Sequence, residues 1–162
     1  MRILLVGIFF ILLLAIFFVL FLILISPKPS REYGVQSVTL KGEDVRSYKE
    51  KIIADYFTRH NISYIYEPKV ITKNRLINFS IGYSDFYLPD YDVYVEFWGL
   101  VTSKDEITKN RYIRRMKQKM AQYYANDIKF ISIYPDNLKN FENFDWIFRR
   151  KFKQVTGFEL PN

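Results

Sequence analysis

The stretch that decides the fold is SDFYLPDYDVYVEFWG, residues 84–99. Two short runs rich in aromatic and β-branched residues flank Pro89-Asp90, whose turn chemistry predicts a hairpin. Alternate residues of a strand point to opposite faces of a sheet. In the second run, one face carries the apolar residues Val93 and Val95, and the other carries Glu96.

The segments on either side of this hairpin complete the predicted fold. Helices are expected at residues 47–60, 110–126 and 137–154, and strands at 62–67, 76–83 and 128–134. A helix lies between the hairpin and the last strand, so that strand need not pair as a hairpin and is expected to be parallel to a neighbour. The fold class is therefore α/β, with a mixed sheet flanked by helices.

The N-terminal segment predicts a membrane anchor ahead of this domain. Residues 3–25 carry no charge, and at about 1.5 Å per residue they can cross a hydrocarbon core of about 30 Å. We expect one transmembrane helix in residues 1–26, a linker in 27–42 and the domain in 43–162. A cleaved signal peptide is the alternative, but the apolar run is long for one and no small-residue cleavage site closes it.

The charges beside the apolar run suggest an orientation. Arg2 precedes it, while Lys28, Arg31 and Lys41 follow it. By the positive-inside rule, a single-pass protein with these flanks has a cytoplasmic C-terminal domain.

Composition limits the chemistry. The formal net charge is +7, which favours a polyanionic partner, either nucleic acid or anionic lipid headgroups. The chain has no cysteine and one histidine, His60. Disulfides, thiolate zinc sites and a cysteine nucleophile are therefore excluded, and a Ser-His-Asp triad would have to use His60.

Three carboxylates and a lysine are candidates for a catalytic site. Asp85 and Glu96 belong to the adjacent hairpin strands, Glu50 to the first helix and Lys119 to the middle helix. Two hard carboxylates suit Mg²⁺ or Mn²⁺, which also binds phosphate oxygens and water. Such an ion lowers the pKa of bound water and neutralises charge on a phosphate.

At these positions the sequence resembles the PD-(D/E)xK nuclease superfamily, in the variant whose second strand ends in Glu96-Phe97-Trp98-Gly99. The element Ser84-Asp85-Phe86 is similar to the family's Pro-Asp-Phe, with serine in place of proline. The resemblance implies a restriction-endonuclease-like fold that cuts DNA or RNA. It also implies metal ligation by Asp85, Glu96 and the Phe97 carbonyl, with Glu50 supporting the site.

The lysine departs from the usual pattern, which would place it at Trp98. The variant family carries it on the following helix, and Tyr112-x-x-x-Met116-x-x-Lys119-x-x-x-Tyr123 is similar to that helix motif. Helical geometry also favours Lys119, because it falls on the stripe of Tyr112, Met116 and Tyr123, whereas Lys117 does not.

Other interpretations of these residues stay open. Ser47-Tyr48-Lys49-Glu50 is a capping box, which alone could explain Glu50, and Lys119 could extend past its aromatic neighbours to water. Basic residues of the middle helix are expected to hold phosphates: Lys109, Arg111, Arg114, Arg115 and Lys117. The alternatives to a nuclease are a catalytically silent nucleic-acid-binding domain of the same fold and a scaffold that binds anionic lipid.

Overall fold

The computed structural model describes residues 36–72 and 79–160, together with Ile16. Residues 36–72 and 79–160 belong to one compact unit. Its α-helices are α2 (Tyr48–Arg59), α3 (Glu106–Ala125) and α4 (Phe141–Thr156), and short 3-10 helices are η1 (Pro89–Tyr91), η2 (Gly99–Thr102) and η3 (Pro135–Leu138). Its strands are β1 (Ser37–Val38), β2 (Asp44–Val45), β3 (Ile65–Tyr66), β4 (Lys69–Ile71), β5 (Ser80–Tyr83), β6 (Phe86–Leu88), β7 (Val93–Phe97) and β8 (Phe130–Ile133).

The central sheet has the strand order β3-β6-β7-β8. Strands β6 and β7 form the expected antiparallel hairpin, with η1 at its turn and Asp92 in the left-handed region at φ 48°. Strand β8 runs parallel to β7, and Ser132 lies opposite Glu96. The α/β class with a mixed sheet flanked by helices is thus confirmed.

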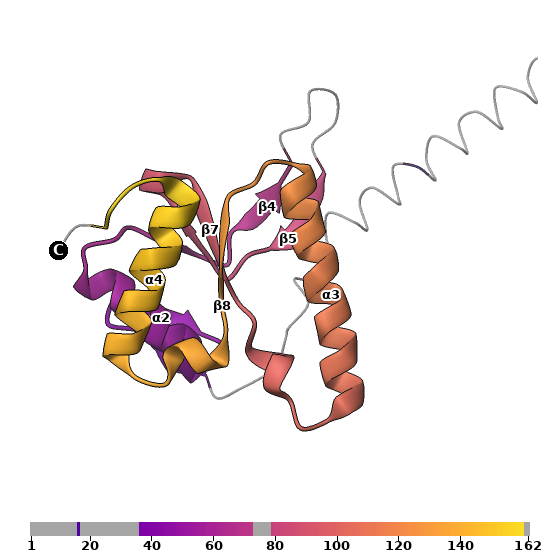
Figure 1. Cartoon of the computed structure of the whole chain (residues 1–162), viewed down its shortest axis with the longest axis horizontal. Helices are drawn as coiled ribbons and strands as arrows, with labels where there is room; N and C mark the ends of the chain where they lie inside the picture. Colours follow the sequence, from indigo (N-terminus) through magenta and orange to yellow (C-terminus); the bar gives the residue numbers. More distant parts are fainter. Residues whose placement is uncertain (1–15, 17–35, 73–78, 161–162) are drawn as a thin grey trace, which may run out of the picture. The chain divides into compact units, whose positions relative to one another are not determined.

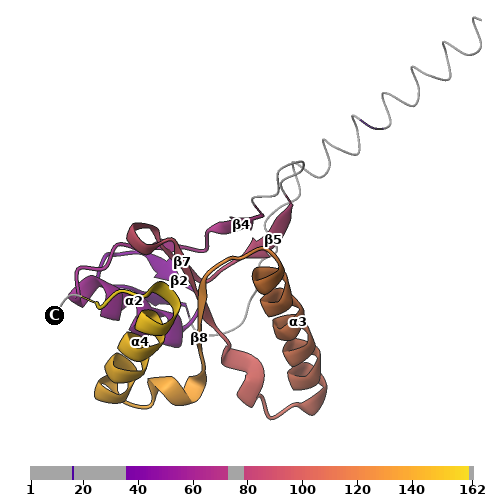
Figure 2. The ribbon, with the colours of Figure 1, turned by 45° about the horizontal axis from the view of Figure 1, so that its top comes forward.

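The two faces of the sheet are covered by different helices. Helices α2 and α4 lie on one side and α3 lies on the other (Figures 1 and 2). The α2–α4 side holds the larger apolar core, in which Val93 and Val95 meet Phe57 and Phe148. On the α3 side, Tyr123 packs with residues of β4 and β8. Glu96 points to the α3 side, because its side chain contacts that helix.

The helices begin where polar side chains cap them. Ser47 accepts a hydrogen bond from the Glu50 amide at the start of α2, as expected of an N-cap. Asp105 caps α3 through the Thr108 amide, so this helix begins at Glu106 rather than near Asn110. The last helix likewise begins after a cap, at Asn140, because η3 occupies the residues before it.

Two strand pairs lie outside the central sheet. Strand β4 pairs with β5, and β1 pairs with β2. Strand β4 was not predicted, because a strand of three residues has too short a pattern and depends on pairing with a later segment, β5. Strand β1 lies within residues 27–42, the segment expected to be a linker.

The predicted fold class needs correction in its N-terminal part, where we expected a transmembrane helix. Among the helices of the described residues, none combines the length and the apolar character needed to cross a membrane. Helix α3 has 20 residues, but six of them are Lys or Arg. Over the described residues, the fold class is therefore a mixed sheet flanked by helices, without a membrane span. The predicted span, residues 3–25, lies outside the described residues apart from Ile16.

The outer edge of β8 is covered by a side chain of α4. The Ile133 carbonyl accepts a hydrogen bond from Trp98, which follows β7, so the preceding carbonyl, that of Ser132, faces away from β7. Lys151 donates to this carbonyl at 2.6 Å and also contacts Asn137. Burial lowers the pKa of Lys151.

We expect Phe148→Ala to lower the free energy of unfolding by about 3–5 kcal/mol, because it removes a ring from a closely packed core. Phe148 is fully buried and contacts the rings of Tyr56, Phe57, Phe144 and Phe152. Trp146→Ala is the control on the same helix, since Trp146 is 60% exposed. Chemical denaturation of both variants measures the difference, and equal stabilities would contradict the packing described above.

Candidate active site between the hairpin and helix α3

The candidate site is centred on the Glu96 carboxylate of β7. This side chain is 2% exposed, so its charge needs hydrogen-bonding partners inside the protein. Helix α3 supplies them: the Lys119 ammonium lies 2.7 Å from both carboxylate oxygens, and the Tyr123 hydroxyl donates to Oε1 at 2.5 Å. The predicted lysine and glutamate are therefore in direct contact.

Lys119 is held by further contacts around its ammonium group. It donates to the carbonyl of Tyr83 at 2.6 Å. It also lies 5.7 Å from the ring centres of Trp98 and Tyr123, within the range of cation–π attraction. The lysine of α3 thus reaches the neighbourhood of Trp98, the residue that stands where the usual family pattern has its lysine.

Asp85 follows β5 and is anchored by backbone contacts. Its Oδ2 accepts a hydrogen bond from the Phe97 amide at 2.6 Å, and its own carbonyl accepts from the Glu67 amide. Burial and, next, the charge of Glu96 raise the pKa of Asp85 above its usual range, while the Lys119 ammonium acts in the opposite direction. Asp85 and Glu96 are therefore close enough for their charges to interact.

Glu50 lies beside this pair but is engaged locally. Its Oε2 accepts hydrogen bonds from the Arg46 amide at 3.0 Å and the Tyr66 hydroxyl at 2.7 Å. Only the Ser47 half of the predicted capping box is formed, because Ser47 accepts from the Glu50 amide while Glu50 accepts from the Arg46 amide in place of the Ser47 amide. The Glu50 charge still contributes to the raised pKa of Asp85, so Glu50 adds negative potential to the site.

Ser84, which stands where the nuclease family that the sequence resembles has proline, makes contacts that proline could not make. Its amide donates to the Pro68 carbonyl at 3.0 Å, and proline has no amide hydrogen to donate. Ser84 is 1% exposed, and its hydroxyl oxygen lies 3.0 Å from the Phe86 carbonyl and 3.2 Å from the Val95 carbonyl, which share its one hydrogen. Serine at this position therefore joins the hairpin strands next to Asp85.

A Mg²⁺ ion at these donor groups would have to keep water ligands, because the protein would not enclose it. Among the residues that the structure describes, no group of three or more His, Cys, Asp or Glu side chains is arranged to hold a metal. Mg²⁺ needs only one or two carboxylates when substrate phosphates and water complete its shell. Each carboxylate oxygen has more than one acceptor site, so Glu96 can contact Lys119 and a cation together. The Phe97 carbonyl, the third predicted ligand, lies 3.4 Å from the Tyr112 hydroxyl.

The contact of Tyr123 with Glu96 was not predicted, although this residue was part of the helix motif. Burial, then the charge and hydrogen bond of Glu96, raise the pKa of Tyr123 well above its usual range. The hydroxyl therefore stays protonated and acts as a donor. The signal available in the sequence was its position four residues after Lys119, which places both side chains on one helix face.

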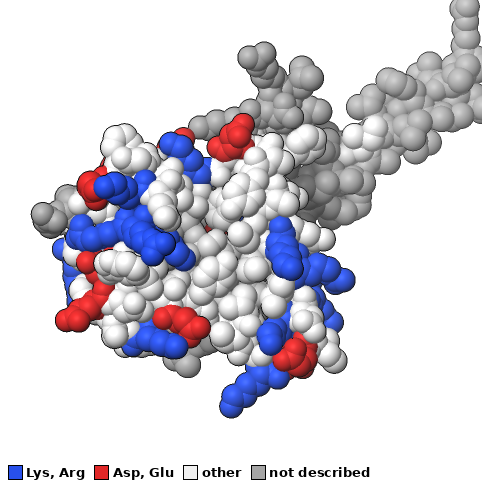
Figure 3. Space-filling model, viewed as in Figure 1, with Lys and Arg blue, Asp and Glu red and all other residues white. Residues whose placement is uncertain are grey.

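The five predicted phosphate contacts lie along α3. Arg111, Arg114, Arg115 and Lys117 are exposed, and Lys109 is half-buried and paired with Glu106. Figure 3 shows basic side chains gathered over this helix. They share this helix with Lys119, whose own side chain is partly buried against the sheet.

Comparison of the chain with protein-family models, with curated proteins and with solved structures finds no match.

We expect Tyr123→Phe to lower the free energy of unfolding by about 1–3 kcal/mol, because it removes a hydrogen bond from a buried charged group. Tyr124→Phe is the matched control on the next residue, which is 69% exposed. Chemical denaturation compares the two. If both variants match the unsubstituted chain, Tyr123 does not stabilise Glu96.

Proposed function

We propose that the chain hydrolyses phosphodiester bonds of nucleic acid, with Mg²⁺ or Mn²⁺ held at Asp85 and Glu96. The observation that supports this most is the meeting of groups from three segments around one carboxylate. Glu96 comes from β7, Lys119 from α3, and Asp85 from the link between β5 and β6. Acidic and basic groups in this combination suit the stabilisation of phosphate transfer.

The two carboxylates are the residues that would hold the cation. Burial and, next, the charge of Glu96 raise the pKa of Asp85, and a divalent cation would offset the repulsion between the two carboxylates. When bound, the ion supplies a water of lowered pKa and neutralises charge on the phosphate oxygens. The hydrogen bond from the Phe97 amide keeps the Asp85 carboxylate in place before substrate arrives.

Lys119 would act on the phosphate or on the attacking water. Its side chain is 18% exposed and its ammonium lies against Glu96, so Lys119 sits at the boundary between the protein interior and solvent. A positive charge fixed there stabilises the additional negative charge of the transition state. The Tyr83 carbonyl and the rings of Trp98 and Tyr123 orient it.

A second candidate function is metal-free binding of nucleic acid by a catalytically silent domain. The observation that favours it is that both oxygens of Glu96 already accept hydrogen bonds from Lys119 and Tyr123. In that case the buried pair would only connect the sheet to α3. The basic residues of α3 would serve either function.

We expect Asp85→Asn, Glu96→Gln and Lys119→Met each to reduce divalent-metal-dependent cleavage of DNA or RNA by at least about a hundredfold, because each removes a charge from the reacting centre. Cleavage of labelled oligonucleotides with Mg²⁺, Mn²⁺ or EDTA provides the measurement. The matched controls are the exposed substitutions Asp90→Asn, Glu142→Gln and Lys129→Met.

Circular dichroism of these variants separates loss of chemistry from loss of folding, which matters because Glu96 is buried. Full activity in a folded Asp85, Glu96 or Lys119 variant would refute the nuclease proposal. Binding without cleavage by the unsubstituted chain would favour the silent domain.

We expect Arg114→Ala and Arg115→Ala to weaken binding of nucleic acid and to lower the dependence of log affinity on log salt concentration. Each lost phosphate contact should reduce the slope by about 0.9 on duplex DNA. Lys129→Ala, an exposed cation outside α3, is the control. Titrations at several salt concentrations give the slopes, and unchanged slopes for both arginine variants would exclude α3 as the phosphate-binding surface.

A further inference from the structure

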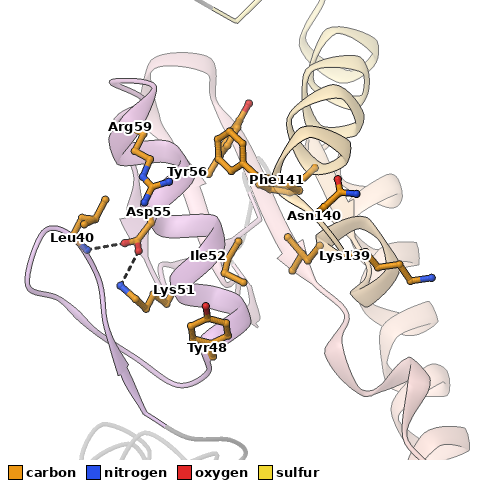
Figure 4. A pocket seen from close by; sticks show the side chains of 12 residues that line it. Leu40, Tyr48, Lys51, Ile52, Asp55, Tyr56, Arg59, Lys139, Asn140 and Phe141 are labelled. Atoms are coloured by element: carbon orange, nitrogen blue, oxygen red, sulfur yellow. Dashed lines mark hydrogen bonds and ion pairs between the residues drawn. The ribbon is translucent and has the colours of Figure 1, made fainter.

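A groove separate from the Glu96 site lies between α2 and the corner formed by η3 and α4 (Figure 4). It has a volume of about 450 Å³, which is within the range of sites for small organic groups. Ile52, Leu138 and Phe144 contribute its apolar lining. Helix α2 contributes residues both to the surroundings of the Glu96 site and to the groove, because Glu50 contacts Tyr66 while other residues of the helix line the groove.

Two aromatic rings at the groove are exposed to solvent. Tyr48 is 61% exposed and Phe141 is 47% exposed. One side of the Phe141 ring is supported, because it lies nearly parallel to the His60 ring, with the centroids 6.3 Å apart and an interplanar angle of 12°. The Tyr56 ring lies 5.9 Å away. Such a ring is a prepared surface on which another flat group can stack.

The charges of the groove are mainly positive. Its lining contains Lys51, Arg59 and Lys139 against a single acid, Asp55, so the formal balance is three minus one, or +2. Asp55 is already bound by Lys51 at 2.8 Å and by the Leu40 amide at 2.7 Å. Lys139 pairs with Asp136, but both side chains are highly exposed, and an ion pair in water stabilises weakly. Arg59 therefore leaves positive potential at the groove, and Lys139 adds a cation at its outer rim, where the side chain extends away from α2 (Figure 4).

We propose that this groove binds unpaired nucleotides of single-stranded nucleic acid. Exposed rings with adjacent cations are the combination by which proteins hold single strands, since bases stack on the rings and phosphates meet the cations. A duplex does not fit this role, because its bases are already stacked on one another inside the helix. That the polyanion is nucleic acid rests on the proposed function. The groove adds that the substrate has a single-stranded part.

The test measures binding without cleavage. The full-length chain is purified in a mild non-ionic detergent, because residues 3–25 are apolar, and is titrated in EDTA into fluorescein-labelled oligothymidylate or a labelled hairpin duplex of equal length. The double variant Tyr48→Ala/Phe141→Ala removes both rings. Its control is Trp146→Ala/Phe158→Ala, two rings that are each 60% exposed and lie outside the groove lining.

We expect the groove variant to bind oligothymidylate at least about tenfold more weakly, as loss of base stacking predicts, and to bind the duplex within about twofold of the unsubstituted chain. The control should bind both as the unsubstituted chain does. Arg59→Gln with Lys139→Gln should also weaken binding of the single strand. It should reduce the salt dependence, which loss of stacking alone would not change.

Three results would overturn the proposal. These are unchanged affinity for the single strand, an equal loss for single strand and duplex, and groove-dependent binding of a polyglutamate peptide in place of the oligonucleotide. The last would assign the groove to an acidic protein segment. Asp85→Asn keeps the two proposals apart, because it should reduce cleavage in the assay with Mg²⁺ while leaving groove-dependent binding in the EDTA titrations intact.

Discussion

The structure depends on how it accommodates one buried charge. The Glu96 carboxylate is almost inaccessible to water, and a buried carboxylate without partners would strongly destabilise the fold. Lys119 and Tyr123 offset this by approaching it from α3. The same contacts fix which side of α3 faces the sheet, so that Arg114 and Arg115 face solvent. The position of the basic surface thus follows from the requirement of a single acidic side chain.

Much of the central fold could be predicted from local patterns. The alternation of Val93 and Val95 with Glu96 predicted the two faces of β7 correctly, because strand geometry fixes which side each residue points to. Helical periodicity likewise placed Lys119 on the side of α3 that faces the sheet. Both predictions use regular spacing within one element, and neither depends on contacts between distant segments.

The remaining features depend on such distant contacts. Strand β4 forms by pairing with β5. The Ser84 amide donates to the Pro68 carbonyl, and only folding brings these two groups together. Tyr123 was noticed as part of a motif, yet its partner across the site could not be read from spacing alone. The expected transmembrane helix rested on composition alone, and the described elements contain no membrane span. Asp105 is the N-cap of α3, and an aspartate at this position is a local sequence signal from which the start of the helix at Glu106 could have been predicted.

The contact of Lys151 with the Ser132 carbonyl has a consequence for the behaviour of the molecule in concentrated solution. An exposed edge strand has unpaired backbone groups, with which a strand of another chain can pair and so begin aggregation. Here the margin of β8 is occupied by an ammonium group from α4, and the opposite margin is the two-residue strand β3. A strand of a neighbouring molecule would have to displace Lys151 to pair with β8, and at the other edge β3 offers only two residues for pairing. The sheet is therefore protected from indefinite growth without an additional strand to close it.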